Sequence, residues 1–250
     1  MTDAWAELRN TTQARIGLGR AGDALPTRRV LELRAAHSAA RDAVHEPLDV
    51  ETFAAQIADL GLGAPIVVQS RARNRSEYLR RPDLGRIPTT LDSLADTGAE
   101  IGVVLADGLS PRALTDHGAP LLAALVDVLG ERHRIATPVI ATEARVALGD
   151  HVGQALGVGT VLVVIGERPG LSVADSLGIY LTHLPRPGRA DADRNCVSNI
   201  HPPDGLGYQD AALVVSALVD GARRLGRSGV ALKDTSGADP LASPAPIVEL

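Results

Sequence analysis

The chain contains one cysteine, Cys196, within the polar segment DRNCVSNI over residues 193–200. A thiol in such surroundings could serve as a nucleophile, because the thiolate is the reactive form of cysteine. No base stands beside Cys196 in the sequence, and a lone cysteine is more often a compact apolar side chain. We therefore expect Cys196 to pack closely against a ligand, and we assign no catalytic residue to this chain.

Residues 17–22 read GLGRAG and match the G-x-G-x-x-G pattern, with an acid twenty residues further on at Asp42. A dinucleotide fingerprint needs a buried strand before the pattern and a helix that opens at its last glycine. The preceding residues 10–16, NTTQARI, are too polar for that strand. A glycine-rich turn that lets the backbone approach a partner is the favoured interpretation. A stand-alone nucleotide-binding α/β enzyme remains the alternative function.

A segment rich in arginine spans Arg71–Arg86 and holds six arginines and one tyrosine. Glu77 and Asp83 interrupt it, and a single aromatic ring offers little stacking for bases. We favour a surface for docking another protein and expect no nucleic-acid binding; a solvated loop is the third reading.

Seven histidines are scattered along the chain without nearby acids at metal-ligand spacing, so no metal site is predicted. These are His37, His45, His117, His133, His151, His183 and His201.

Short apolar runs alternate with helical stretches, which is typical of a parallel sheet covered on both faces. The runs predict strands at residues 66–68, 101–106, 135–141, 160–165, 179–184 and 229–232; the stretches between them predict helices at 111–129, 144–156 and 208–225. We predict an α/β fold: a Rossmann-like, mostly parallel sheet over residues 63–234. A small helical domain over residues 1–62 precedes it, and a flexible tail follows over 235–250.

Polar and glycine residues follow three of these strands at the point where each ends. They are Asp107-Gly108, Glu143-Ala144-Arg145, and residues 166–170, GERPG. Because ligands bind at the carboxyl ends of parallel strands, we expect these loops to converge on one site.

The composition bounds the class of protein. Of 250 residues, 45% are hydrophobic, only 2% are aromatic, and the net charge is −5. The charge argues against a polyanion as partner, and the single cysteine is compatible with a reducing cytoplasm. The sequence shows no signal peptide and no apolar run of the roughly 18 residues that a membrane span needs.

Several segments together resemble the small (light) chain of ethanolamine ammonia-lyase, over about residues 10 to 235. The most specific are IGERPGLS at 165–172 and RNC-S-NI at 194–200. The others are ARIGLGRAGDALP at 14–26, RDAVH at 41–45, YLRRPDLGR at 78–86, ADGLS at 106–110, RVALGD at 145–150 and KD at 233–234.

The resemblance implies a subunit that is inactive alone and packs on a large barrel-shaped subunit in a hetero-oligomer. It implies adenosylcobalamin as cofactor, held between the two chains for the radical conversion of ethanolamine to acetaldehyde and ammonia. The cofactor carries the hard step, and the protein supplies position and polarity. The chain lacks the D-x-H-x-x-G sequence that ligates cobalt in base-off corrinoid proteins, so no metal ligand is implied.

Three cofactor contacts are implied by the matching motifs. The valine of RVALGD falls on Val146, the glutamate of GERPGL on Glu167, and the cysteine of RNC-S-N on Cys196. Amide groups on a corrin edge can donate hydrogen bonds to the Glu167 carboxylate. Glu167 could instead pair with Arg168 or Arg145 and merely hold a turn.

The segment ahead of the first motif is shorter than in some relatives, whose extension is linked to packaging in a bacterial microcompartment. We expect a cytoplasmic protein, and encapsulation in a microcompartment stays open.

Overall fold

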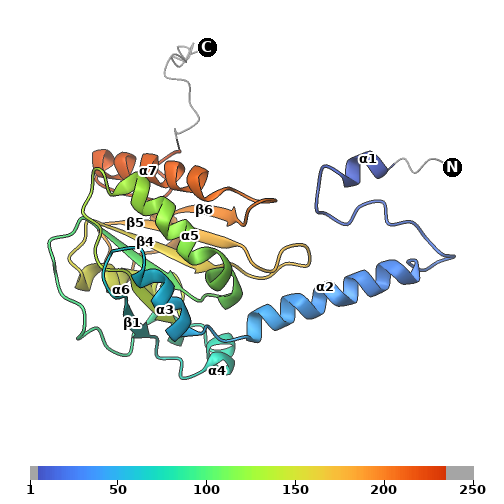
Figure 1. Cartoon of the computed structure of the whole chain (residues 1–250), viewed down its shortest axis with the longest axis horizontal. Helices are drawn as coiled ribbons and strands as arrows, with labels where there is room; N and C mark the ends of the chain where they lie inside the picture. The colour runs from blue at the N-terminus through green and yellow to red at the C-terminus, as the bar shows by residue number, and fades with distance from the viewer. Residues whose placement is uncertain (1–4, 235–250) are drawn as a thin grey trace, which may run out of the picture.

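The structure is a computed structural model that describes residues 5–234. The tail predicted over residues 235–250 lies outside the described residues. Figure 1 shows a sheet flanked by helices, with a long helix that extends away from it. The helices are α1 (Ala6–Arg9), α2 (Thr27–His45), α3 (Val50–Ala58), α4 (Arg75–Arg80), α5 (Pro111–Leu129), α6 (Leu148–Ala155) and α7 (Tyr208–Leu225), with 3-10 turns η1 (Leu84–Arg86) and η2 (Asp191–Asp193). The strands are β1 (Ile66–Gln69), β2 (Ile101–Ala106), β3 (Val139–Thr142), β4 (Thr160–Gly166), β5 (Leu177–His183) and β6 (Asn195–Ile200).

The six strands form one mixed sheet in the order β1-β3-β2-β4-β5-β6. The pairs β1–β3, β3–β2 and β2–β4 are parallel, whereas β4–β5 and β5–β6 are antiparallel. The α/β class is therefore confirmed, and the parallel part of the sheet carries the strand ends at which the sequence predicts a site.

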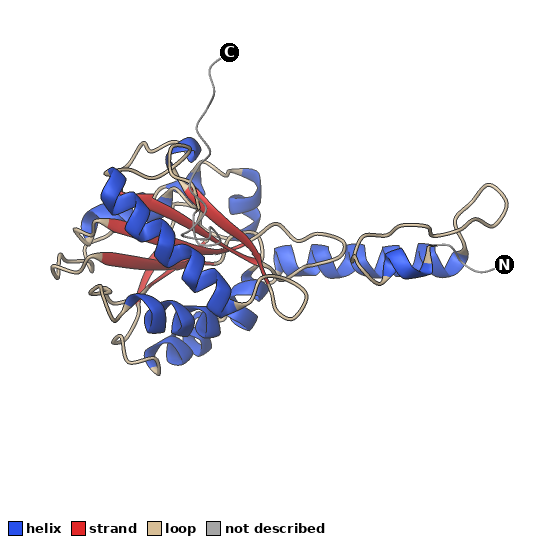
Figure 2. Ribbon diagram, turned by 90° about the horizontal axis from the view of Figure 1, so that it is seen from above, coloured by secondary structure: helices blue, strands red, loops and turns tan. Residues whose placement is uncertain are grey.

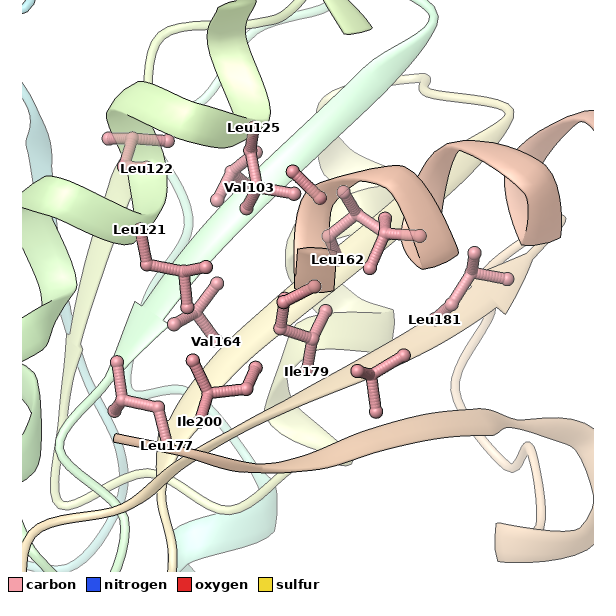
Figure 3. Packing of buried hydrophobic residues seen from close by; sticks show 14 of the residues in the cluster. Val103, Leu121, Leu122, Leu125, Leu162, Val164, Leu177, Ile179, Leu181 and Ile200 are labelled. Atoms are coloured by element: carbon pink, nitrogen blue, oxygen red, sulfur yellow. The ribbon is translucent and has the colours of Figure 1, made fainter. Parts of the chain in front are cut away.

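Alternating side chains of the central strands build a separate core on each face of the sheet. On β2, Val103 and Leu105 pack beneath α5 and α7, while Val104 packs on the opposite face, which α6 covers. Figure 3 shows the first of these cores, in which leucine, isoleucine and valine side chains interdigitate. Aliphatic packing of this kind is what a chain with 2% aromatic residues must use.

Three parts of the sheet differ from the prediction. The strand predicted over residues 135–141 is shorter, because β3 begins only at Val139, just after Pro138. Residues 229–232 form no strand: Val230 is 73% exposed, and Leu232 turns inward against Gly221 of α7. Strand β6 was not predicted, because its sequence NCVSNI buries only Val197 and Ile200 and so lacks an apolar run.

The N-terminal residues form an arm, defined here as residues 5–45, which projects from the sheet (Figure 2). Helix α2 buries only Ala43, whereas Phe53 and Ile57 of the following helix α3 join the core beneath α5. The arm folds back so that Arg15 donates to the carbonyl of Leu171, in the β4–β5 loop, at 2.8 Å. The division into domains at residues 62 and 63 stays a prediction. In the described residues, no helix combines the length and apolarity that crossing a membrane requires.

Candidate functional site

A pocket of about 420 Å³ opens at the carboxyl ends of β2 and β4, beside the loop that connects β3 to α6. All three loops singled out from the sequence contribute to it, as the clustering of strand ends in a parallel sheet requires. Its lining residues are Tyr78, Gly108, Leu109, Arg145, Val146, Ile165, Gly166, Glu167, Arg168 and Tyr180.

A buried carboxylate ties two of the loops together. Asp107 is 2% exposed and accepts the backbone N–H groups of Glu143 at 2.7 Å and Ala144 at 2.9 Å. Burial raises the pKa of Asp107 to about 7, although the two N–H donors and the guanidinium of Arg75 work against that rise. Glu143 adopts φ of +51°, a strained conformation for this residue type, so the loop is held by its contacts rather than by preference.

Glycines allow the β2 and β4 loops to meet. The N–H of Leu109 donates to the carbonyl of Gly166 at 2.9 Å. A Cβ on Gly108, which has φ of +57°, would overlap that carbonyl, and one on Gly166 would overlap the carbonyl of Ser110. The two backbones can therefore approach this closely only where side chains are absent.

Two residues of α4 support the pocket, although the sequence indicated only a surface segment there. Tyr78 is fully buried, and its hydroxyl donates to the carbonyl of Ala144 at 3.0 Å. Two guanidinium groups lie over its ring, that of Arg145 at 4.5 Å and that of Arg75 at 4.9 Å from the ring centroid. The i, i+3 spacing of Arg75 and Tyr78 places both on one helix face, which is the one signal the sequence held.

Three of the six arginines of the 71–86 segment pair with carboxylates. Arg73 contacts Glu77 at 3.0 Å, and Arg81 contacts Asp83 at 2.7 Å. Arg75 is 8% exposed and lies within 4 Å of both Asp107 and Glu143. The segment therefore does not present an uninterrupted basic face of the kind that binds nucleic acid.

Glu167 follows β4 and accepts hydrogen bonds from the loop before β5 and from strand β6. Its Oε2 atom accepts the hydroxyl of Ser176 at 2.7 Å and the backbone N–H of Asn199 at 3.2 Å. A Cβ on Gly178 would lie 2.9 Å from Oε1, so the carboxylate rests directly on the sheet. The alternative pairing with Arg145 or Arg168 is wrong, because neither forms an ion pair or hydrogen bond with Glu167 in residues 5–234.

Val146 lines the pocket directly, whereas Cys196 lies beside one of the residues that line it. Val146 lines the pocket, is half-buried and packs against the core on the α6 face. Cys196 of β6 is exposed and lies opposite Tyr180 of β5, which lines the pocket. Partial burial of the thiol raises its pKa, and the Glu167 carboxylate raises it further. A thiol with a raised pKa is a poor nucleophile, which agrees with the expectation of a packing role.

The GLGRAG segment forms a loop between α1 and α2. Its three glycines have φ values of +56°, +77° and +65°, residues 5–16 hold no strand, and the next helix begins only at Thr27. The strand and helix that would place a pyrophosphate are both missing around this loop. The dinucleotide interpretation therefore loses its structural basis.

A larger cavity of about 940 Å³ lies at the opposite edge of the sheet, near Leu62, Val126 and Ile135. None of the predicted contacts lines it, and it lies at the amino ends of the parallel strands. Volume alone therefore does not identify the site, and the smaller pocket is the better candidate.

The fold and pocket define an α/β protein with a ligand site at the carboxyl edge of a mixed sheet. Residues 2–233 match the model of the ethanolamine ammonia-lyase light chain family. An ethanolamine ammonia-lyase small subunit from Rhodococcus erythropolis is 70% identical over 96% of this chain and 94% of its own length. Those from Rhodopseudomonas palustris and Ralstonia nicotianae are 48% and 46% identical, over 92% and 93% of this chain and 90% and 88% of their own lengths. The chain belongs to the ethanolamine ammonia-lyase light chain family, and is thus a subunit of a lyase.

Proposed function

We propose that this chain helps to hold adenosylcobalamin against the large subunit of ethanolamine ammonia-lyase, with Val146, Glu167 and Cys196 in contact with the corrinoid. The observation that carries the proposal is the pocket at the carboxyl edge of the sheet. Val146 and Glu167 line it, and Cys196 lies next to its Tyr180 wall. These residues come from three separate segments of the chain, and the presence of Val146 and Glu167 in one pocket supports the proposal.

The chemistry of the donor set fits a corrinoid edge. Both hydrogen bonds of the Glu167 carboxylate use Oε2, so Oε1 is free within the described residues to accept an N–H from a corrin amide. Val146 offers an apolar surface, and Cys196 offers a compact side chain without a reactive thiolate. Arg145 contributes a buried Nε with no hydrogen-bond partner among the described residues, as expected of a site built for a further group.

The size of the pocket determines how much of the task this chain could perform. A cavity of about 420 Å³ is smaller than a corrin ring with its side chains. This chain would therefore cover one part of the cofactor, and the large subunit would enclose the rest. The bound cofactor would supply the radical that converts ethanolamine to acetaldehyde and ammonia.

The test is reconstitution. Co-expression with the large subunit should give a complex that releases ammonia from ethanolamine only when adenosylcobalamin is added. Each chain alone should be inactive, because neither encloses the cofactor. A large subunit that works equally well without this chain would refute the proposal.

A further inference from the structure

We propose that Arg145, assisted by Arg168, forms an anion-binding site in this pocket and that its ligand is the phosphodiester in the nucleotide loop of the corrinoid. The inference rests on the proposed function and adds a second, charged point of recognition to it. Arg145 and Arg168 both line the pocket that holds Glu167.

Arg145 is positioned before any ligand arrives. Its guanidinium stacks over the ring of Tyr78 at 4.5 Å, and its backbone N–H donates to the carbonyl of Gly85 at 2.8 Å. Tyr78 is itself fixed, since it is fully buried and its hydroxyl is bonded to Ala144. The close packing of Gly85 against both side chains leaves no room for a Cβ, which would lie 2.8 Å from the Tyr78 ring. A guanidinium held in this way loses little side-chain entropy when it binds.

The positive charge of Arg145 is not neutralised inside the chain. Within residues 5–234 neither Arg145 nor Arg168 forms an ion pair, and the Nε of Arg145 is buried without a hydrogen-bond partner. The neighbouring carboxylates are engaged elsewhere. Asp107 and Glu143 face Arg75 at 3.7 Å and 3.5 Å, and Glu167 accepts from Ser176 and Asn199.

A buried donor and two unpaired guanidinium groups beside one solvated carboxylate favour an anionic ligand. Arginine binds phosphate oxygens through a planar fork of N–H groups, and such charge-assisted bonds are the strongest in proteins. The side chains of a cobalamin ring are neutral amides, and its nucleotide loop carries a phosphodiester. The phosphodiester is thus the group of the proposed ligand that matches these arginines.

The experiment compares two corrinoids on the complex of this chain with its large subunit. Cyanocobalamin contains the nucleotide loop, and dicyanocobinamide lacks it. Equilibrium dialysis followed by visible absorbance gives both dissociation constants without relying on activity. Arg145→Met should weaken cyanocobalamin binding roughly tenfold to a hundredfold, as loss of a charge-assisted hydrogen bond implies, and change cobinamide binding less than about twofold.

Two further variants make the test specific. Arg145→Lys keeps the charge without the fork and should give an intermediate affinity for cyanocobalamin. Arg227→Met removes an exposed arginine at the end of α7, away from the pocket, and should change neither constant. The thermal midpoint of each complex should stay within about 2 °C of the wild-type value, since methionine preserves the packed stem.

Three results would overturn the inference. Equal weakening of both corrinoids by Arg145→Met would place the arginine on the corrin ring or in a structural role. Unchanged constants with weaker association of the two subunits would assign Arg145 to a carboxylate of the large chain. Failure of the wild-type complex to bind either corrinoid would refute the proposed function itself.

Discussion

The Glu167 carboxylate accepts both of its hydrogen bonds within the chain through Oε2 and leaves Oε1 for a ligand. Its role in binding can therefore be tested apart from its role in the fold. Glu167→Gln keeps the size of the side chain and removes its charge. We predict that the complex with the large subunit binds cyanocobalamin about tenfold more weakly, because bonds to an ionised acceptor are stronger than bonds to a neutral one. Equilibrium dialysis measures the constant. The thermal midpoint of the Glu167→Gln complex should change by less than about 2 °C, because the carboxylate is only partly buried, at the end of a strand.

Glu131→Gln is the matched control for that prediction, since Glu131 is exposed and lines only the cavity at the opposite edge. It should leave affinity and midpoint unchanged. A loss of stability in Glu167→Gln that parallels its loss of affinity would assign the residue to holding the turn.

Asp107 should make the stability of the chain depend on pH. Its pKa is raised from 3.8 to about 7, so between these values the folded state binds more protons than the unfolded chain. Stability from this group is therefore greatest at low pH and falls as pH rises towards 7, by at most about 1.4 kcal/mol per pH unit. Asp107→Asn should flatten this dependence, measured as the free energy of unfolding in urea at pH 5 and pH 7.5.

Because neighbouring charged groups also titrate, the test compares the pH dependence of the free energy of unfolding between Asp107→Asn and the wild type. Arg75, Glu143 and Tyr78 all face Asp107 and remain in both proteins. Asp204→Asn, at an exposed position, provides the control. Parallel pH profiles for the wild type and Asp107→Asn would show that Asp107 is already ionised at pH 5.

Part of this site could be predicted from the sequence. The strand-end positions of Asp107, Arg145 and Glu167 follow from apolar runs that stop at polar residues. Tyr78 and Arg75 were missed as pocket residues, because their role depends on the packing of α4 against the loop after β3. No local pattern specifies that contact, and a dense run of arginines is ordinarily solvated.

At the scale of elements, Ser110 connects helix α5 to the pocket. Its hydroxyl oxygen accepts the N–H of Ala113 at 3.3 Å as the N-cap, and it donates to the carbonyl of Ala174 in the β4–β5 loop at 2.8 Å. Ser110→Ala should lower the free energy of unfolding by roughly 1–3 kcal/mol, because both bonds are lost at a fully buried position. Urea unfolding monitored by circular dichroism provides the measurement.

Asp49→Ala offers a comparison at another N-cap. Asp49 caps α3 by accepting the N–H of Thr52 at 3.2 Å and the hydroxyl of Thr52 at 2.7 Å, and both residues are exposed. Its loss should be smaller, roughly 0.5–1 kcal/mol, as for caps open to water. Each variant loses two hydrogen bonds, so equal losses for Ser110→Ala and Asp49→Ala would show that burial of the Ser110 bonds adds nothing.

Elements with strong local patterns were predicted closely. The bounds of β2, α5 and α7 match the prediction, since each has a continuous apolar run or a clear helical stripe between breakers. Strand β6 was not predicted because it lies at the edge of the sheet, where one face is solvated and the sequence is polar. The composition of residues 229–232 is typical of a strand, but the strand that pairs with β5 at the end of the sheet is β6.

At the scale of the whole molecule, the arm over residues 5–45 is highly exposed, and its helix α2 buries only Ala43. Leu31 is 58% exposed, and the arm carries seven arginines against four acidic residues in a chain whose net charge is −5. A helix with so little packing has low local stability. We predict that amides 30–42 of α2 exchange with deuterium faster than those of α5 in the isolated chain.

Binding of the large subunit should slow exchange in α2 if the arm is a docking element, and mass spectrometry of peptic fragments resolves the two helices. Helix α7 serves as the internal reference, since it packs on α5 and the sheet in the chain alone. Unchanged exchange in α2 upon complex formation would show that the arm makes no contact with the large subunit.

The central claim concerns where a corrinoid lies relative to the carboxyl edge of this sheet. A solved structure of the two-subunit complex with bound cobalamin tests it most directly. We predict that the corrin edge lies within about 4 Å of Val146 and Cys196, with an amide nitrogen about 3 Å from Glu167 Oε1. A cobalamin enclosed by the large chain alone, or seated at the cavity near Leu62 and Ile135, would contradict it.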